Sequence, residues 1–126
     1  MAVRVVRFGE PRAPGEGVRI GTVRYLPRGV SKEERAARFF DVWLPELAPS
    51  EELLRAFRAS GDWPALERGY RRQLREPAAR HLLELLAALS KVTDIAVGCY
   101  CEDRERCHRS ILAEALQAAG AEVVLA

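Results

Sequence analysis

Hydrophobic and polar residues alternate in two short segments near the N-terminus. Residues 3–8 (VRVVRF) and 18–25 (VRIGTVRY) are rich in β-branched side chains, and a Pro/Gly-rich stretch at 11–17 separates them. Alternation with this composition is typical of β-strands. The sequence therefore predicts two strands joined by a turn region.

The middle of the chain has helical spacing instead. Ser31, followed three residues later by Glu34, is typical of a capped helix, which we predict to run to about residue 40. Three more helices are predicted, at 51–59 capped by Ser50, at 63–75 capped by Asp62, and at 77–89 opened by Pro77. Trp43 and Trp63 are expected at helix positions, as packing anchors.

The last third of the chain changes to a strand, a helix and a second strand. These are predicted at 92–101, at about 105–119 and at 121–125, with Gly120 ending the helix. A β-α-β unit brings its two strands parallel, with a right-handed crossover. Residues 1–126 are therefore predicted to form a single α/β domain of three layers, a mostly parallel four-stranded sheet with helices on its faces.

The composition fits one globular domain. Of 126 residues, 48% are hydrophobic, and 20 basic against 18 acidic side chains leave a net charge of +2. Disordered chains combine few apolar residues with high net charge, so disorder is excluded. No apolar stretch approaches the roughly 20 residues of a membrane-spanning helix, and the first ten residues lack the apolar core of a signal peptide. A cytoplasmic location without membrane contact is expected, and the near-neutral charge disfavours a nucleic acid partner.

Candidate chemistry gathers where the third predicted strand ends. Parallel α/β sheets bind ligands at the carboxyl ends of their strands, here residues 25–28 and 99–104. The second stretch contains Cys99 and Cys101, which share one face of the strand because side chains alternate. Cys107 and His108 follow at the predicted helix start, so we expect sulfur atoms, an imidazole and free helix N–H groups to converge.

Four uses of this cysteine segment remain open. A thiol beside a histidine at a helix N-terminus has its thiolate favoured, which makes Cys101 or Cys107 a candidate nucleophile and His108 a candidate proton carrier. The three cysteines and the histidine also supply four zinc ligands, at a poor spacing because helix neighbours diverge by about 100°. The helix start can instead bind a phosphate or carboxylate, with added charge from Arg104, Arg106 or Arg109. Finally, Cys99 and Cys107 can be packing residues, and an odd local cluster is not the pattern of a disulfide scaffold.

Two arginines follow the second predicted strand. Arg24 and Arg28 flank a Tyr-Leu-Pro segment, and the Pro-Arg-Gly sequence favours a turn. Guanidinium groups bind oxyanions through two parallel N–H donors, so both are candidate ligand-binding residues. The alternative is that they pair with Asp41 or Glu46 and only fix the turn.

A wider resemblance is carried by residues 24–32 (RYLPRGVSK), 43–50 (WLPELAPS), Trp63, Tyr70, Cys101-Glu102 and 107–110 (CHRS). Across nearly the whole chain these segments resemble an uncharacterised bacterial family, DUF488, in its YeaO-like branch. The resemblance implies a single α/β domain with a pocket, and no established activity. The family motif positions fall on Arg24, Pro27, Arg28, Gly29, Cys107, His108 and Arg109. Family members usually carry an acidic residue before the first arginine, and Val23 stands there, which argues against a carboxylate base or metal ligand at that position.

The sequence thus predicts a pocket at the strand ends for a small anionic ligand, such as a phosphorylated molecule. Its candidate catalytic residues are Cys101, Cys107 and His108, and its candidate ligand-binding residues are Arg24, Arg28, Arg109 and Ser110. The sequence specifies no metal, cofactor, substrate or oligomeric state. The alternative is a non-catalytic binding module for zinc or nucleic acid.

Overall fold

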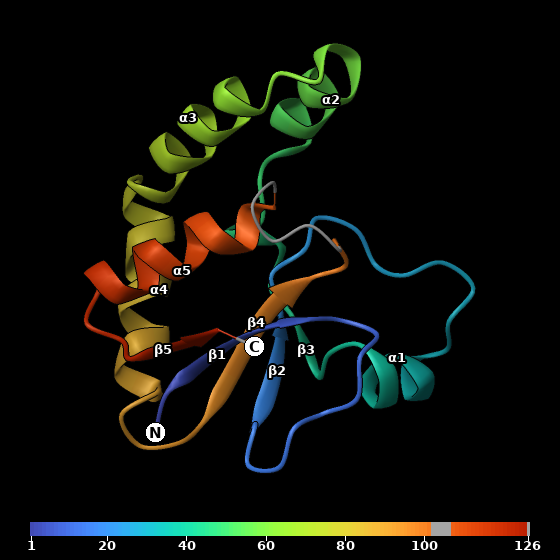
Figure 1. Ribbon diagram of the computed structural model, residues 1–126, viewed down its shortest axis with the longest axis vertical. Coiled ribbons are helices and arrows are strands. Elements are labelled where there is room, and N and C mark those ends of the chain that lie inside the picture. Colours follow the sequence, from blue (N-terminus) through green and yellow to red (C-terminus); the bar gives the residue numbers. More distant parts are fainter. Residues whose placement is uncertain (102–106, 126) are drawn as a thin grey trace.

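Five parallel strands form one sheet in the computed structural model, which describes residues 1–101 and 107–125 (Figure 1). They are β1 (Val3–Arg7), β2 (Val18–Gly21), β3 (Val42–Trp43), β4 (Ile95–Cys99) and β5 (Val123–Leu125). The order across the sheet is β3-β2-β4-β1-β5, and every neighbouring pair is parallel. The parallel α/β prediction is therefore confirmed.

The predicted number of four strands is wrong, because β3 adds a fifth at the edge. Trp43 lies in this strand and not in a helix. Backbone bonds from Asp41 N to Arg19 O (2.9 Å) and from Leu44 N to Gly21 O (2.9 Å) attach the segment to β2. Residues 42–43 thus form a strand because they pair with β2, although the local sequence does not indicate a strand there.

Six helical segments connect the strands within residues 1–101 and 107–125. They are α1 (Lys32–Arg38), the 3₁₀ helix η1 (Pro45–Leu47), α2 (Glu51–Ser60), α3 (Trp63–Leu74), α4 (Pro77–Leu89) and α5 (His108–Ala118). The predicted caps are confirmed, since Ser31, Ser50 and Asp62 each accept a backbone N–H from the first turn of their helix. The predicted start of the last helix, near residue 105, lies outside the described residues.

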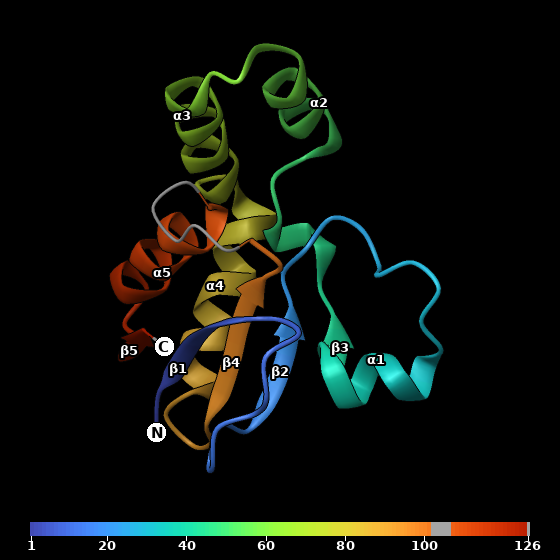
Figure 2. The same cartoon turned by 45° about the vertical axis from the view of Figure 1, so that its right-hand side comes forward.

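Two apolar clusters cover the two faces of the sheet. On one face, Val3 and Val5 of β1 and Ile95 and Val97 of β4 pack against η1, α3, α4 and α5. The other face has a smaller cluster that includes Val6, Phe8, Val23, Phe40, Ala96, Cys99 and Cys107. In both views helices α4 and α5 lie on the opposite side of the strands from α1, which lies beside β3 (Figures 1 and 2).

The strands β1, β2 and β4 end at the same side of the sheet, which we call the carboxyl edge. Helices α2 and α3 extend beyond this edge in both views (Figures 1 and 2). Helix α5 begins beside it, with Cys107 as its N-cap. Within the described residues, no helix combines the length and the apolar character that crossing a bilayer requires.

Candidate functional site

The carboxyl edge brings together the end of β2, the end of β4 and the first turn of α5. The ring Nε2 of His108 lies 2.8 Å from the carbonyl oxygen of Thr22, one residue beyond β2. Cys107, next to His108, contacts Cys99 at the end of β4. The end of β2, the end of β4 and the start of α5 therefore contact one another, as the sequence predicted.

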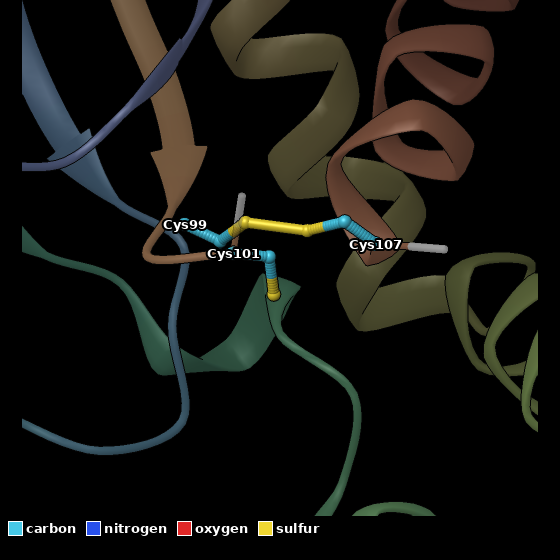
Figure 3. A group of neighbouring side chains, drawn as sticks. All are labelled: Cys99, Cys101 and Cys107. Atoms are coloured by element: carbon cyan, nitrogen blue, oxygen red, sulfur yellow. A yellow bond between two sulfur atoms is a disulfide. The ribbon is translucent and has the colours of Figure 1, made fainter. Parts of the chain in front are cut away.

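The three cysteines lie close together, and we call Cys99, Cys101 and Cys107 the three-cysteine cluster. Their sulfur atoms all lie within 4.8 Å of one another. Cys99 and Cys107 are buried, each 1% exposed, and are joined in a disulfide (Figure 3). Cys101 is exposed and outside that disulfide. The odd, local cluster of cysteines in the sequence was interpreted as evidence against a disulfide scaffold, and the Cys99–Cys107 bond differs from that expectation.

His108 is held in one protonation state. A backbone carbonyl only accepts hydrogen bonds, so Nε2 carries the proton toward Thr22 and Nδ1 keeps a lone pair. Burial lowers the pKa of His108 to about 4; the bond to Thr22 opposes this shift and the charge of Arg109 adds to it. At neutral pH the imidazole is therefore uncharged, with a lone pair on Nδ1.

Tyr70 of α3 fixes the other side of the imidazole. Its ring meets the His108 ring edge-on, with centroids 5.7 Å apart. The Tyr70 hydroxyl donates to the carbonyl of Leu47 at 2.5 Å, and burial raises the pKa of this hydroxyl, so it stays protonated. Tyr70 is fully buried and thereby connects α3, η1 and the start of α5.

Thr22 fastens the end of β2 to β4. Its hydroxyl donates to the carbonyl of Gly98 at 2.9 Å and lies 3.3 Å from the Gly98 amide. The Thr22 amide bonds the carbonyl of Ile20 at 3.0 Å, so the chain turns out of the sheet here. This turn ends β2 at Gly21, four residues before the predicted end, and aims the Thr22 carbonyl at His108.

Arg24 borders this site and is anchored to the linker between η1 and α2. Its Nε donates to the carbonyl of Pro49 and its Nη2 to the carbonyl of Ala48, both at 3.0 Å. Its Nη1 forms no hydrogen bond to another described residue. Asp41, one of the acids considered as its partner, pairs with Arg12 at 2.9 Å. The guanidinium of Arg24 is thus oriented by backbone carbonyls and not by a carboxylate.

The remaining candidate residues differ in their environment. Arg109 is 5% exposed, and its Nη1 lies 3.4 Å from the carbonyl of Val6 at the end of β1. The hydroxyl of Ser110 donates to the carbonyl of Cys107 at 2.9 Å, within its own turn. Arg28 is exposed, on the turn that follows Arg24. Arg104 and Arg106 lie outside the described residues.

The structure therefore brings Cys101, Cys107, His108 and Arg109 together, with Arg24 at the border. Sequence reasoning did not assign a role to Thr22 or Tyr70, although both hold His108. No local signal identifies them, because Thr22 acts through backbone and hydroxyl groups and Tyr70 lies on a helix distant in sequence. Among the described residues, the three-cysteine cluster also has the donor spacing to hold a metal ion.

The fold and the site define an α/β protein whose last helix starts with Cys-His-Arg. Comparison with known protein families shows that the chain belongs to the DUF488 family. The family model that matches is DUF488-N3a, described as the active DUF488-N3 subclade, and it covers residues 3–120. The predicted family is thus confirmed, while the YeaO-like branch stays a prediction. Neither the curated proteins nor the solved structures contain a match.

Proposed function

We propose that this protein is a thiol-dependent enzyme that acts on a small anionic molecule at the carboxyl edge of the sheet. The observation that supports the proposal is the contact of His108 Nε2 with the Thr22 carbonyl, 2.8 Å apart, because it joins the start of α5, beside the three-cysteine cluster, to the end of β2. Parallel α/β sheets bind ligands at this edge. The family model is described as an active subclade, which favours an enzyme over a passive binding module.

Cys101 is the nucleophile in this proposal. It is the exposed member of the three-cysteine cluster, whereas Cys99 and Cys107 are buried. The Cys101 sulfur lies within 4.8 Å of the sulfur of Cys107, the N-cap of α5, and the positive end of a helix favours a thiolate over a thiol. Cys107 holds the helix start against β4 and thereby positions its neighbour His108.

The anion is bound by groups that point to the same edge. Arg24 offers Nη1, with the rest of its guanidinium oriented by the Ala48 and Pro49 carbonyls. The N-terminal end of α5, which begins at His108, carries the positive end of the helix dipole, and this suits an oxyanion. The Nδ1 lone pair of the uncharged His108 can accept a hydrogen bond from the ligand. Arg28, which is exposed on its turn, extends the positive surface beyond Arg24.

A metal-binding module is the second candidate, and the spacing of the three sulfur atoms favours it. The nucleic-acid alternative has no comparable support, because a formal net charge of +2 provides little attraction for a phosphate backbone.

The test compares an anionic with a neutral alkylating reagent. Iodoacetate and iodoacetamide attack the same thiolate, so the ratio of their rates reports an anion-binding site beside it. With chelator present and at neutral pH, we expect the iodoacetate-to-iodoacetamide ratio at Cys101 to exceed that of free cysteine about tenfold. Inorganic phosphate should slow the iodoacetate reaction, and peptide mass mapping identifies the labelled cysteine.

Substitutions separate the two parts of the proposal. Cys101→Ser should remove the fast reaction with both reagents, whereas Arg24→Gln should lower only the iodoacetate preference. Arg80→Gln, which removes an exposed arginine from α4, is the matched control and should leave the ratio unchanged. Equal reagent preference in the wild type and Arg24→Gln would contradict the anion site, and slow labelling of native Cys101 would contradict the nucleophile.

A further inference from the structure

The three-cysteine cluster combines sulfur atoms from two elements and the segment between them. Cys99 ends β4, Cys101 follows two residues later, and Cys107 caps α5 (Figure 3). Their sulfur atoms lie within 4.8 Å of one another. Three thiolates around one ion, at metal–sulfur bonds of about 2.3 Å, stand about 4 Å apart. The spacing is therefore close to that of a three-thiolate metal site.

The backbone separation also fits a bridging ion. The Cα atoms of Cys99 and Cys107 are 7.8 Å apart. Cα atoms across a disulfide usually lie about 4.4–6.8 Å apart. An ion between the two sulfur atoms replaces one sulfur–sulfur bond by two metal–sulfur bonds of about 2.3 Å each, and the longer bridge suits the wider gap between β4 and α5.

The surroundings suit a soft cation. Cys99 and Cys107 pack in an apolar cluster with Val6, Phe8 and Val23, so no carboxylate of that cluster competes as a ligand. His108, the nearest imidazole in sequence, bonds Thr22 through Nε2 and does not belong to the sulfur group. Thiolate ligands select zinc-type and copper(I)-type ions over magnesium and calcium.

We propose that the reduced protein binds one thiophilic cation of the zinc and cadmium type through the thiolates of Cys99, Cys101 and Cys107. The fourth position faces solvent on the side of exposed Cys101. The proposal goes beyond the enzymatic function, because bound metal occupies the Cys101 thiolate and blocks its alkylation. The cluster then has two alternative states, a metal-bound reduced form and an oxidised form with the Cys99–Cys107 disulfide.

The two states interconvert by balanced steps. A phosphine reductant breaks the Cys99–Cys107 sulfur–sulfur bond, both sulfur atoms are reduced to thiols, and the phosphine becomes its oxide with oxygen from water. Metal binding then forms three metal–sulfur bonds, and the three thiol protons pass to buffer. Reoxidation by peroxide releases the metal, forms the disulfide again and yields water.

The experiment titrates phosphine-reduced protein with Cd²⁺ and follows the ultraviolet charge-transfer absorption of cadmium–thiolate bonds. We expect saturation at one ion per chain, displacement by excess Zn²⁺, and loss of binding after oxidation. Cys101→Ser should remove about one third of the absorption, because one of three sulfur ligands is gone. Cys101 is exposed, so this variant is expected to fold like the wild type.

Two controls distinguish the cluster from other cation sites. His81→Ala removes the exposed histidine of α4 and should leave the titration unchanged. Cys99→Ser and Cys107→Ser should each lose about one third of the cadmium–thiolate absorption. Circular dichroism verifies that these two variants fold. Absorption that is unchanged in Cys101→Ser, or binding that His81→Ala abolishes, would overturn the proposal. The alkylation test uses chelated protein, so failure of metal binding leaves the enzymatic proposal standing.

Discussion

Replacing Gly98 with alanine should destabilise the protein by about 3 kcal/mol or more. Gly98 lies in β4 opposite Val6 of β1, and an added Cβ would stand 2.0 Å from the Val6 carbonyl oxygen. That oxygen belongs to the strand backbone, so the two strands must separate to make room. The Thr22 hydroxyl also bonds both backbone groups of Gly98, so the change also disturbs the β2 end that holds His108.

Urea denaturation followed by circular dichroism measures this effect. The control is Gly29→Ala in an exposed turn, where an added Cβ meets no atom within 4 Å and only the φ of +69° opposes a side chain. We expect that control to cost about 1 kcal/mol. If Gly98→Ala were as stable as the wild type, β1 and β4 would not pair in this register.

Replacing Arg19 with leucine should cost about 3–5 kcal/mol, because it leaves a buried carboxylate without its partner. The side chains of Arg19 and Glu16 are 1% and 3% exposed and form an ion pair. Arg19 also donates to the carbonyls of Phe39 (3.4 Å) and Pro11 (3.3 Å), which would lose a donor. The double variant Arg19→Leu/Glu16→Leu should recover part of the loss, since no unpaired charge remains buried.

The pH dependence should reverse in this variant. In the wild type, burial alone would raise the pKa of Glu16, but hydrogen bonds from Arg19 and Ala13 and the charges of Arg19 and Arg12 outweigh it, so the pKa is lowered. In the unfolded chain the pKa of Glu16 is 4.5, so near that pH the unfolded chain holds more protons than the folded protein. The stability that the ionised Glu16 contributes is therefore present above pH 4.5 and is lost as the pH falls through the lower pKa of the folded protein. Without Arg19 only burial and weaker partners remain, so Arg19→Leu should instead lose stability as the pH rises above about 4.5.

Denaturation curves between acidic and neutral pH test this reversal. The control is Arg71→Gln, which removes a partly exposed arginine paired with Glu67 and Glu114. Exposed ion pairs contribute about 0–1 kcal/mol, so we expect a small change without a reversed slope. Equal stability losses in Arg19→Leu and Arg71→Gln would show that the Arg19–Glu16 pair is not buried as described.

Local signals predicted the helices well. The caps at Ser31, Ser50 and Asp62 depend on a side chain bonding a backbone amide three residues later, which the sequence displays directly. Helix α4 has the predicted bounds, Pro77–Leu89. The strands were less well bounded, because Thr22 ends β2 through bonds to Gly98, and β3 exists only by pairing with β2.

The candidate site shows the same division. Spacing along one strand and one helix was enough to predict that Cys101, Cys107 and His108 meet. It did not show that Cys101 is the exposed thiol or that Cys99 and Cys107 pair. It also did not show Arg24 bound to the linker between η1 and α2, because that contact joins residues more than twenty positions apart.

The amino-acid sequence by itself determined the parallel α/β class, the helix starts and the segment that carries the sulfur and imidazole groups, since periodicity and capping act within a few residues. Only the tertiary structure decided the fifth strand, the buried Arg19–Glu16 pair and the uncharged state of His108 between Thr22 and Tyr70. These features depend on burial and on partners brought together by folding, and neither is encoded in a local pattern.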